Sequence, residues 1–317
     1  MSAGGPYNQS ALGVYLRGLA MGAADIVPGV SGGTIALITG IYDRLLGALT
    51  RFDTDALTLL LRGQWQLLWR AVDGRFLLPL LGGIGSAVLL LAQFIQVAMT
   101  HYPLPLWSFF FGLVACSAVV LWFEEVTQAS RLTLLMLVVG IGVAAAIGLT
   151  ATLAFPGGML GFFFAGALAI CAMILPGISG SFVLLLLGMY GPVIEALTRF
   201  NWPFLATFTL GCAVGLLLFS RLLKWVLAVA RQATMALLAG FLAGSLVTLW
   251  PWQRAVSTVI DRHGDSRVVQ TQPLLPADYA LQYGDSQLLM CLVSALVGVL
   301  VIGVSHRRWV AAEARVR

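Results

Sequence analysis

The sequence predicts an all-α integral membrane protein, built as an inverted-topology repeat in which each half is a re-entrant helical hairpin plus three transmembrane helices. Three observations lead to this prediction: the apolar composition, a motif that occurs twice, and the placement of the Lys and Arg residues. Of the 317 residues, 60% are hydrophobic and 10% are charged, against about 25% charged residues in a typical soluble domain. The composition therefore argues against an ordinary soluble protein.

Apolar stretches long enough to cross a bilayer make up most of the chain. A transmembrane helix needs about 20 mainly apolar residues, and stretches of this kind lie at 76–99, 106–123, 132–154, 233–250 and 287–305. They leave no room for a separate soluble domain. The net charge of +5 comes with 18 Lys and Arg residues spread over short loops, which is typical of membrane proteins and argues against nucleic acid as a partner.

A segment rich in Pro, Gly and Ser occurs twice. An offset of 148 residues places "IVPGVSGG" (26–33) on "ILPGISGS" (174–181), and the match extends to "ALTRF" at 48–52 and 196–200. From position 25 to position 52, 13 of 28 aligned residues are identical. Agreement of this extent indicates an internal repeat.

The helices after the motif repeat with a different offset. An offset of 128 places "FFGLVACSAVVLW" (110–122) on "LAGFLAGSLVTLW" (238–250), and "LLMLVV" (134–139) matches "LLMCLV" (288–293) more weakly. The offsets differ by 20, so the first half contains an insert, at 53–75. Its Trp and Arg residues among apolar ones predict an amphipathic helix at the membrane surface. The predicted repeats are 1–155 and 156–317.

Each half begins with about 40 residues, 11–50 and 158–198, that the motif divides. If each segment returns to its starting side, 14 Lys and Arg residues face the cytoplasm and 4 face outward; if each crosses once, the division is 8 and 10. The first arrangement follows the positive-inside rule, so re-entrant hairpins are predicted. Three crossings per half then place the second half upside down, with both termini cytoplasmic and the loop 251–286 outside.

The divided element has a composition suited to binding an anion. Proline disfavours helical geometry at the preceding residue, which predicts breaks at Val27 and Leu175. Ser31 and Ser179 can cap the helices that follow, and unpaired N–H groups in a first turn attract anions. Two such ends meeting from opposite sides would form one anion site, to which hydroxyls are added by Ser31, Thr34, Ser179 and Ser181. The alternative is that Pro and Gly only kink packed helices.

Charged residues inside the first hairpin are further candidates, because a charge within a membrane is costly and marks function. Arg17 could bind substrate or could extend to the cytoplasmic surface. Asp25 precedes the break and could carry a coupling H+ or Na+. The aligned residue of the second half is Met173, so the repeat is asymmetric at this position.

Other polar residues lie near the hairpin ends. Arg51 and Arg199 form a matched pair that could meet a phosphate headgroup at either surface. Glu195 is a second candidate for ion coupling, although an interfacial anchor is the alternative. Tyr42 and Tyr190 are expected in the interfacial aromatic belt.

The stretch "RGLAMGAADIVPGVSGGTIALITGIYDRLL" (17–46), echoed by "ILPGISGSFVLLLLGMYG" (174–191), resembles the signature of the bacterial polyprenyl-phosphate transporter family of the PopT type, formerly a membrane domain of unknown function. The resemblance implies a multi-pass protein of the bacterial cytoplasmic membrane that returns undecaprenyl phosphate from the outer to the inner leaflet for cell-wall synthesis. The functional residues carried over are Arg17, Asp25, Pro28, Gly29, Ser31, Gly32, Gly33 and Thr34, then Pro176, Gly177, Ser179, Gly180 and Ser181.

Two other functions fit parts of the sequence. Undecaprenyl pyrophosphate phosphatases have inverted repeats and a Pro-Gly-x-Ser-Arg-Ser-type loop, but Gly32 and Gly180 occupy the position of that arginine. Hydrolysis is therefore not expected, and no catalytic residue is assigned. A transporter of a small soluble anion could use the same site. The expected partners are polyprenyl phosphate and membrane lipids, with a homodimer left open. We expect no metal or organic cofactor, only a coupling H+ or Na+.

Overall fold

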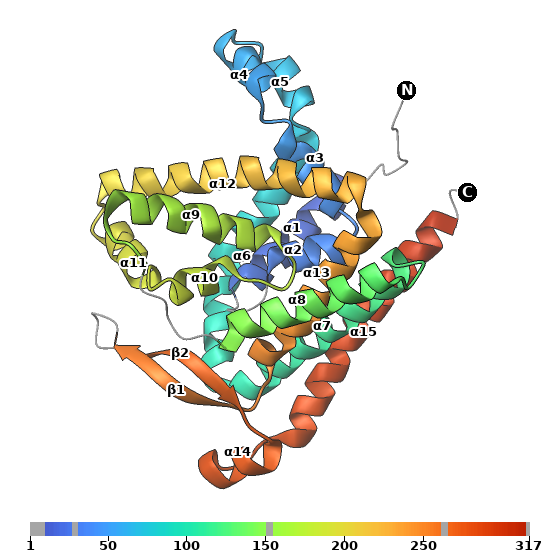
Figure 1. The fold of residues 1–317 in the computed structure, drawn as a ribbon, viewed down its shortest axis with the longest axis vertical. Coiled ribbons are helices and arrows are strands. Elements are labelled where there is room, and N and C mark those ends of the chain that lie inside the picture. The colour runs from blue at the N-terminus through green and yellow to red at the C-terminus, as the bar shows by residue number, and fades with distance from the viewer. Residues whose placement is uncertain (1–9, 27–30, 150–154, 261–265, 315–317) are drawn as a thin grey trace.

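The computed structural model describes residues 10–26, 31–149, 155–260 and 266–314, and its helices follow one another in the same order in both halves (Figure 1). The first half contains α1 (Ala11–Ile26), α2 (Gly32–Ile38), α3 (Tyr42–Thr50), α4 (Thr54–Leu61), α5 (Trp65–Ala71), α6 (Gly74–His101), α7 (Pro103–Glu125) and α8 (Arg131–Leu149). The second half contains α9 (Gly158–Ile174), α10 (Gly180–Leu186), α11 (Tyr190–Thr198), α12 (Trp202–Val229), α13 (Arg231–Leu249), β1 (Gln253–Ile260), β2 (Ser266–Pro273), α14 (Pro276–Tyr283) and α15 (Leu288–Ala314).

Each predicted hairpin consists of three helices, where the sequence suggested two. α9 ends at Ile174, and Leu175 is extended with ψ 126°, as expected before Pro176. Each return arm then breaks again, at Gly40 with φ 70° and at Gly188 with φ 64°. Glycine takes such positive φ values readily, so the repeated "GIY" and "GMY" mark helix ends.

The insert at 53–75 forms two short helices, α4 and α5, and not one amphipathic helix. Asp53 caps α4 by accepting hydrogen bonds from the N–H groups of Asp55 and Ala56. The pair stands out from the bundle (Figure 1) and exposes Leu61 and Trp65. Exposed apolar residues of this kind suit the membrane surface that the sequence predicted for the insert.

The loop 251–286 contains a β-hairpin, so the prediction of an all-α chain is wrong at this place. β1 and β2 pair antiparallel, with Gln253 opposite Pro273 and Ile260 opposite Ser266. α14 follows the hairpin and leads to α15. The indole N–H groups of Trp250 and Trp252 donate to the carbonyl oxygens of Leu274 and Ser286, which fastens this loop to the end of α13.

Several helices of the described residues have the length and composition of membrane spans. α7, α8, α12 and α13 each qualify, and α5 with the first part of α6 forms a bent pair with an angle of 75°. α9 and α15 contain shorter apolar segments, Gly158–Ile174 and Leu288–Val304. These helices confirm the prediction of a helical multi-pass membrane protein, whereas the way in which each half is inserted stays a prediction.

The packing of the helices repeats with the same offsets as the sequence. A Cβ atom on Gly18 would collide with the Leu80 carbonyl, and one on Gly166 with the Phe208 carbonyl. Gly166 is 148 residues after Gly18, and Phe208 is 128 residues after Leu80. α1 therefore packs on α6 as α9 packs on α12, with glycines allowing the close approach.

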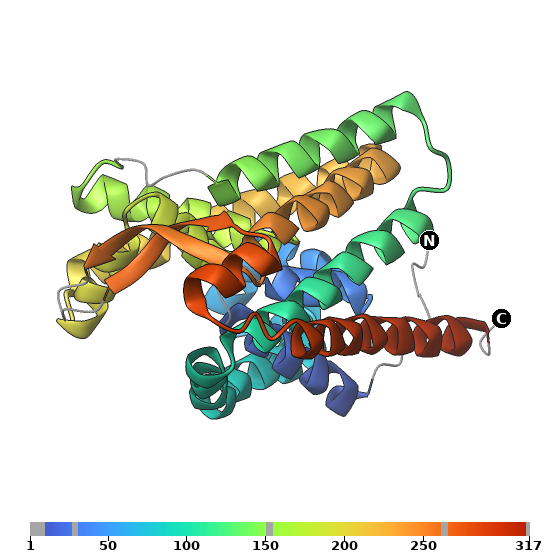
Figure 2. The ribbon, with the colours of Figure 1, turned by 90° about the horizontal axis from the view of Figure 1, so that it is seen from below.

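The last helix of each half packs on a helix of the other half (Figure 2). Gly298 of α15 lies against Phe109 of α7, and Gly140 of α8 lies against Leu237 of α13. These pairs relate α8 to α15 by an offset of 158, whereas the match of "LLMLVV" with "LLMCLV" gave 154. The sequence alignment of the last helices was therefore wrong by four residues, about one helical turn.

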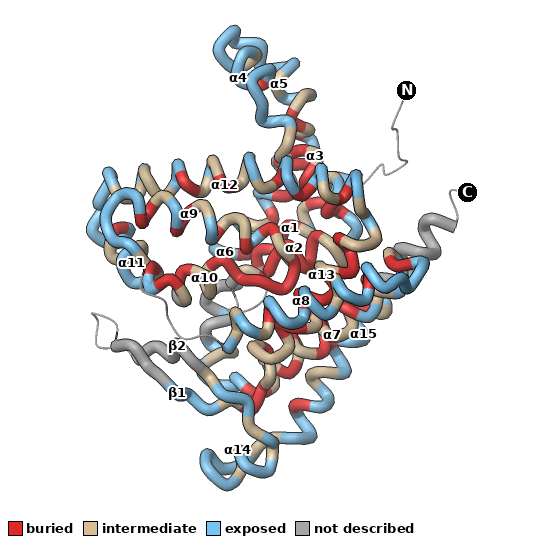
Figure 3. The backbone as a smooth tube through the Cα atoms, viewed as in Figure 1, coloured by how far each residue is buried: buried red, intermediate tan, exposed pale blue. Residues whose placement is uncertain are grey.

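Buried residues concentrate where the first hairpin meets α13, and the outer faces of α8, α12 and α15 are exposed (Figure 3). The main cluster includes Val14 of α1, Ile35 of α2 and Leu242 of α13. The exposed faces carry Leu and Val side chains, as lipid-facing helices do. The core therefore includes both α1 and α2, the two helices on either side of the first motif.

Candidate functional site

The two hairpins contact each other through α2 and α3 of the first and the end of α9 of the second. The Ser31 hydroxyl donates to the Met173 carbonyl oxygen at 2.9 Å, and the Tyr42 hydroxyl donates to the Ile174 carbonyl oxygen at 3.0 Å. In the other direction, the Gly177 N–H donates to Thr34 Oγ1 at 3.0 Å. The last turn of α9 is therefore bonded to α2 and α3 of the first hairpin.

Two glycines allow this approach. A Cβ atom on Gly33 would lie 2.6 Å from the Ile174 carbonyl oxygen and 2.8 Å from that of Met173, which is closer than such atoms can come. Gly177 has φ 82°, and its Cβ atom would meet the Phe241 carbonyl of α13 at 2.8 Å. The backbone of both motifs must therefore pass close to a neighbour, which explains their glycines physically.

The first turn of α2 is already occupied by protein groups. Ser31 is the N-cap, as the sequence predicted, and its Oγ accepts from the Gly33 N–H at 3.1 Å. The Gly32 N–H donates to Asp25 Oδ1 at 2.7 Å. The expectation of unpaired N–H groups is thus wrong for these two residues, because Asp25 places its own carboxylate where a bound anion was expected.

Four hydroxyls gather around the meeting point, and we call them the hydroxyl cluster: Ser31, Thr34, Ser179 and Ser181. Ser31, Thr34 and Ser179 are buried. Ser179 and Ser181 bond to each other, with 2.9 Å between their Oγ atoms. Beside Ser179 lies a cavity of about 10 Å³, lined also by Ser245 and Thr248, which is room for about one water.

The remaining residues of the second motif lie at this meeting point. Pro176 and Gly180 are buried, and a Cβ atom on Gly180 would collide with the Ala169 carbonyl and with Met173. Met173 therefore lies beside Gly180 as Asp25 lies beside Gly32. Pro28 and Gly29 lie outside the described residues.

The three arginine candidates lie away from the hydroxyl cluster. Arg17 donates to the Gly13 carbonyl of its own helix at 3.1 Å, and it precedes Asp25 by about 12 Å along α1. Arg51 reaches toward the Ala71 carbonyl at 3.5 Å. Arg199 forms an ion pair with Glu195 at 3.2 Å. These residues belong to other parts of the fold than the buried hydroxyls.

Glu195 and Arg199 line a second and larger cavity, of about 310 Å³, at the end of the second hairpin. Its wall also includes Phe162 of α9 and Phe204 of α12, whose ring centroids are 4.8 Å apart. The cavity is therefore apolar with two charged groups at one side.

Sequence reasoning missed two features of the site. Tyr42 is only 2% exposed, so its assignment to the interfacial belt is wrong; the repeated "GIY" and "GMY" were the available signal.

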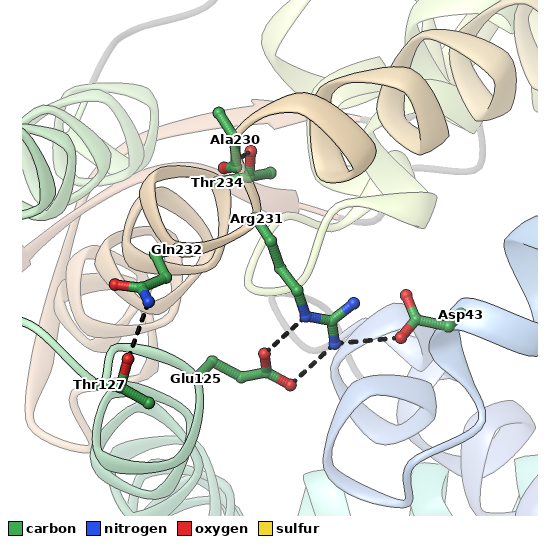
Figure 4. A network of polar contacts seen from close by, with 7 residues as sticks. All are labelled: Asp43, Glu125, Thr127, Ala230, Arg231, Gln232 and Thr234. Carbon is green, nitrogen blue, oxygen red and sulfur yellow. Dashed lines mark hydrogen bonds and ion pairs between the residues drawn. The ribbon is translucent and has the colours of Figure 1, made fainter.

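Arg231 at the start of α13 donates to both Glu125 oxygens at 2.9 and 3.0 Å and to Asp43 at 3.1 Å (Figure 4). Beside it, Gln232 donates to Thr127. An arginine opening an apolar helix was the one sign of this network in the sequence.

Chemically, the meeting point can surround a small anion with hydroxyl and amide donors, provided that Asp25 releases the Gly32 N–H. Hydroxyls can both donate and accept, so Thr34 can donate to a phosphate while it still accepts from the Gly177 N–H, whereas Ser31 would have to release the Met173 carbonyl oxygen. The neighbouring glycines bring the backbone close enough to take part. The site thus has the donors for a phosphate and an internal carboxylate that competes with it.

Comparison with known proteins gives a consistent result. The model of a family described as "Undecaprenyl phosphate translocase-like" matches residues 21–267. A protein of Vibrio cholerae serotype O1 named "Polyprenyl-phosphate transporter" is 42% identical over 296 residues, covering 92% of this chain and 95% of the relative. A Staphylococcus aureus protein of the same name is 31% identical over 267 residues, covering 74% of this chain and 85% of that relative. No solved structure matches this chain.

Proposed function

Because this chain belongs to the undecaprenyl phosphate translocase-like family, we propose that it carries polyprenyl phosphate, and undecaprenyl phosphate in particular, from the outer to the inner leaflet of a bacterial cytoplasmic membrane. The family and the names of both relatives are those of a transporter and not of an enzyme. The isoprenoid tail can stay in the lipid during this movement. Only the phosphate must be shielded, because burying an unpaired charge costs tens of kcal/mol by an idealised estimate.

The observation that carries the proposal is the contact between the two hairpins beside the hydroxyl cluster. Ser31 and Thr34 of one hairpin bond to backbone atoms of the other, beside Ser179 and Ser181. A phosphate that enters here would exchange these internal bonds for bonds to its own oxygens. Because both hairpins supply donors, the movement of one hairpin relative to the other would open the site.

Asp25 gives the site a means of coupling to an ion. Its carboxylate holds the Gly32 N–H at 2.7 Å, which is a donor that the phosphate needs. A proton or Na+ on Asp25 would weaken that bond and reduce the repulsion between the carboxylate and the phosphate. The carrier would therefore take up phosphate together with H+ or Na+.

The proposed arrangement in the membrane is an inverted repeat, with repeats at 1–155 and 156–317 and both termini in the cytoplasm. Two features support it: the Lys and Arg distribution and the contacts that recur when the halves are exchanged. Broken helices in corresponding positions of two inverted halves are a recurring sign of a transport site near the midplane.

The test is a leaflet-resolved assay of undecaprenyl phosphate movement in vesicles that contain the full chain. Thr34→Val keeps the shape of the side chain but leaves the Gly177 N–H without its acceptor, so we expect transport to fall about tenfold, as for one lost buried hydrogen bond. Thr58→Val is the matched control, because exposed Thr58 bonds within α4. Lipid movement no faster than in protein-free vesicles would contradict the proposal, and movement of inorganic phosphate instead would favour a carrier of soluble anions.

A further inference from the structure

The cavity of about 310 Å³ at the end of the second hairpin has room for a ligand, which the small space beside Ser179 does not. Its volume lies within the usual range for small-molecule pockets, about 300 to 1,000 Å³. It is partly open to the outside and is lined by α11 and by the starts of α9 and α12.

The corresponding position in the first half is filled by an arginine. Arg44 donates to both Asp73 oxygens, at 2.8 and 3.1 Å, and its guanidinium carbon lies 4.5 Å from the centroid of the Phe76 ring. With the offsets of 148 for the hairpins and 128 for the following helices, these three positions become Pro192, Asn201 and Phe204, and all three line the cavity. The cavity is therefore the space that an arginine and its partner fill in the other half.

The same offset shows what the second half has gained. Glu195 replaces Gly47, while Arg199 is retained in place of Arg51. The Arg199 side chain is 72% exposed and pairs with Glu195 at 3.2 Å. An exposed ion pair of this kind is weak, whereas a guanidinium can bind a phosphate through two parallel hydrogen bonds. A phosphate can therefore displace Glu195 from Arg199.

The surroundings place this cavity next to lipid. Phe200 and Trp202, between Arg199 and the rest of α12, are both exposed, and so is Leu160 at the start of α9. Aromatic side chains with this exposure collect at the level of the lipid headgroups. The cavity thus offers a cation at headgroup depth and an apolar interior beside it.

We propose that this cavity is a docking site for a lipid phosphate monoester with an isoprenoid chain, in which Arg199 binds the phosphate and the isoprene units next to it lie against Phe162 and Phe204. The inference rests on the proposed function and adds a first binding step before the hydroxyl cluster. The lipid arrives from the leaflet that the second hairpin faces. Glu195 competes with the phosphate for Arg199, and the ion pair between Glu195 and Arg199 forms again when the lipid leaves the cavity.

The test uses the full chain in nanodiscs and geranyl phosphate, a short isoprenoid phosphate monoester, as the probe in a direct binding measurement. Arg199→Gln is expected to weaken binding about tenfold, the effect of losing one charge-assisted bond. Glu195→Gln is expected to strengthen it, because the phosphate no longer displaces a carboxylate. Arg254→Gln is the matched control, since exposed Arg254 bonds to Gln272 across the β-hairpin. In vesicles, Arg199→Gln should raise the half-saturating concentration of undecaprenyl phosphate, and Glu195→Gln should lower it.

Opposite effects of the two substitutions are the decisive sign, because a purely structural ion pair would weaken binding when either partner is removed. Equal binding by Arg199→Gln and Arg254→Gln overturns the inference, even if the wild type moves lipid. Inorganic phosphate or phosphatidylglycerol competing as well as geranyl phosphate also overturns it, since the site would then recognise free phosphate or any phospholipid. Binding through Arg199 without lipid movement would instead contradict the proposed function and leave the docking site standing.

Discussion

The first hairpin is fastened to the rest of the molecule by polar contacts, whereas the second hairpin ends at a cavity. Beside α3, Lys224 donates to Thr50 and Arg221 donates to the Phe52 carbonyl, both from α12. Asp43 at the start of α3 pairs with Arg231 of α13. At the end of α11, Glu195 and Arg199 pair with each other and line the open space.

This difference shows that a repeated backbone can carry two unlike ends. The glycine contacts between α1 and α6 recur between α9 and α12, so the scaffold is shared. The ends of the hairpins share "ALTRF" but differ just before it, where Pro192 replaces Arg44 and Glu195 replaces Gly47.

The largest effect is expected at Gly33, where the motifs "SGG" and "SGS" differ. Gly33→Ser makes the first motif identical to the second, but its Cβ atom would lie 2.6 Å from the Ile174 carbonyl oxygen. Overpacking of this kind costs about 1–3 kcal/mol, and here it would separate the two hairpins. We expect a clear loss of thermal stability in detergent and almost no lipid transport.

The reciprocal exchange is the control. Ser181→Gly removes one hydroxyl of the cluster with its bond to Ser179 and adds a glycine to α10, which costs about 1 kcal/mol; because it creates no clash between the hairpins, transport should fall less than for Gly33→Ser. If both exchanges lower stability and transport equally, the close contact of Gly33 with α9 is wrong, and the two motifs do not differ in the way described.

The repeat and the contact between the two hairpins could be predicted from the sequence, because both depend on a pattern of Pro, Gly and Ser that few other structures require. The "PGxSG" pattern and its offset of 148 led to Ser31 as an N-cap and to two ends in contact. The burial of Tyr42 was missed because a Tyr near a hairpin end also fits the interfacial belt, and only its contact with the Ile174 carbonyl shows that it is inside the fold.

Other features were hidden for a different reason. α8 and α15 consist almost wholly of apolar residues, so an alignment displaced by one turn looks as good as the true one, and the contacts of Gly140 and Gly298 decide between them. The bond from Gly32 to Asp25 was missed because the sequence shows that an acid precedes the break but not that it turns back to the new helix.

An intermediate effect is expected at Asp25, whose counterpart is Met173. Asp25→Asn keeps an oxygen for the Gly32 N–H but removes the charge and the titrating group. The hairpin should remain folded, and transport should no longer respond to an imposed H+ or Na+ gradient. Uptake is measured in vesicles with and without each gradient, beside Asp55→Asn, which makes the same change at an exposed residue of α4. If the gradients stimulate uptake by Asp25→Asn as much as uptake by the wild type, Asp25 has no role in ion coupling. The two halves would then be more alike than proposed.

The smallest effects are expected in the network of Arg231, which fastens the first hairpin to α7 and α13. Glu125 holds the guanidinium with two bonds and Asp43 with one, so Glu125→Gln should destabilise the protein more than Asp43→Asn. Because the Arg231 side chain is 46% exposed, the cost is about 0.5–1 kcal/mol for Glu125→Gln and less for Asp43→Asn. Thermal unfolding at low and high salt measures both, and the difference should shrink as salt screens the charges. A larger cost for Asp43→Asn would show that Arg231 stabilises the first hairpin mainly through Asp43 and not through Glu125.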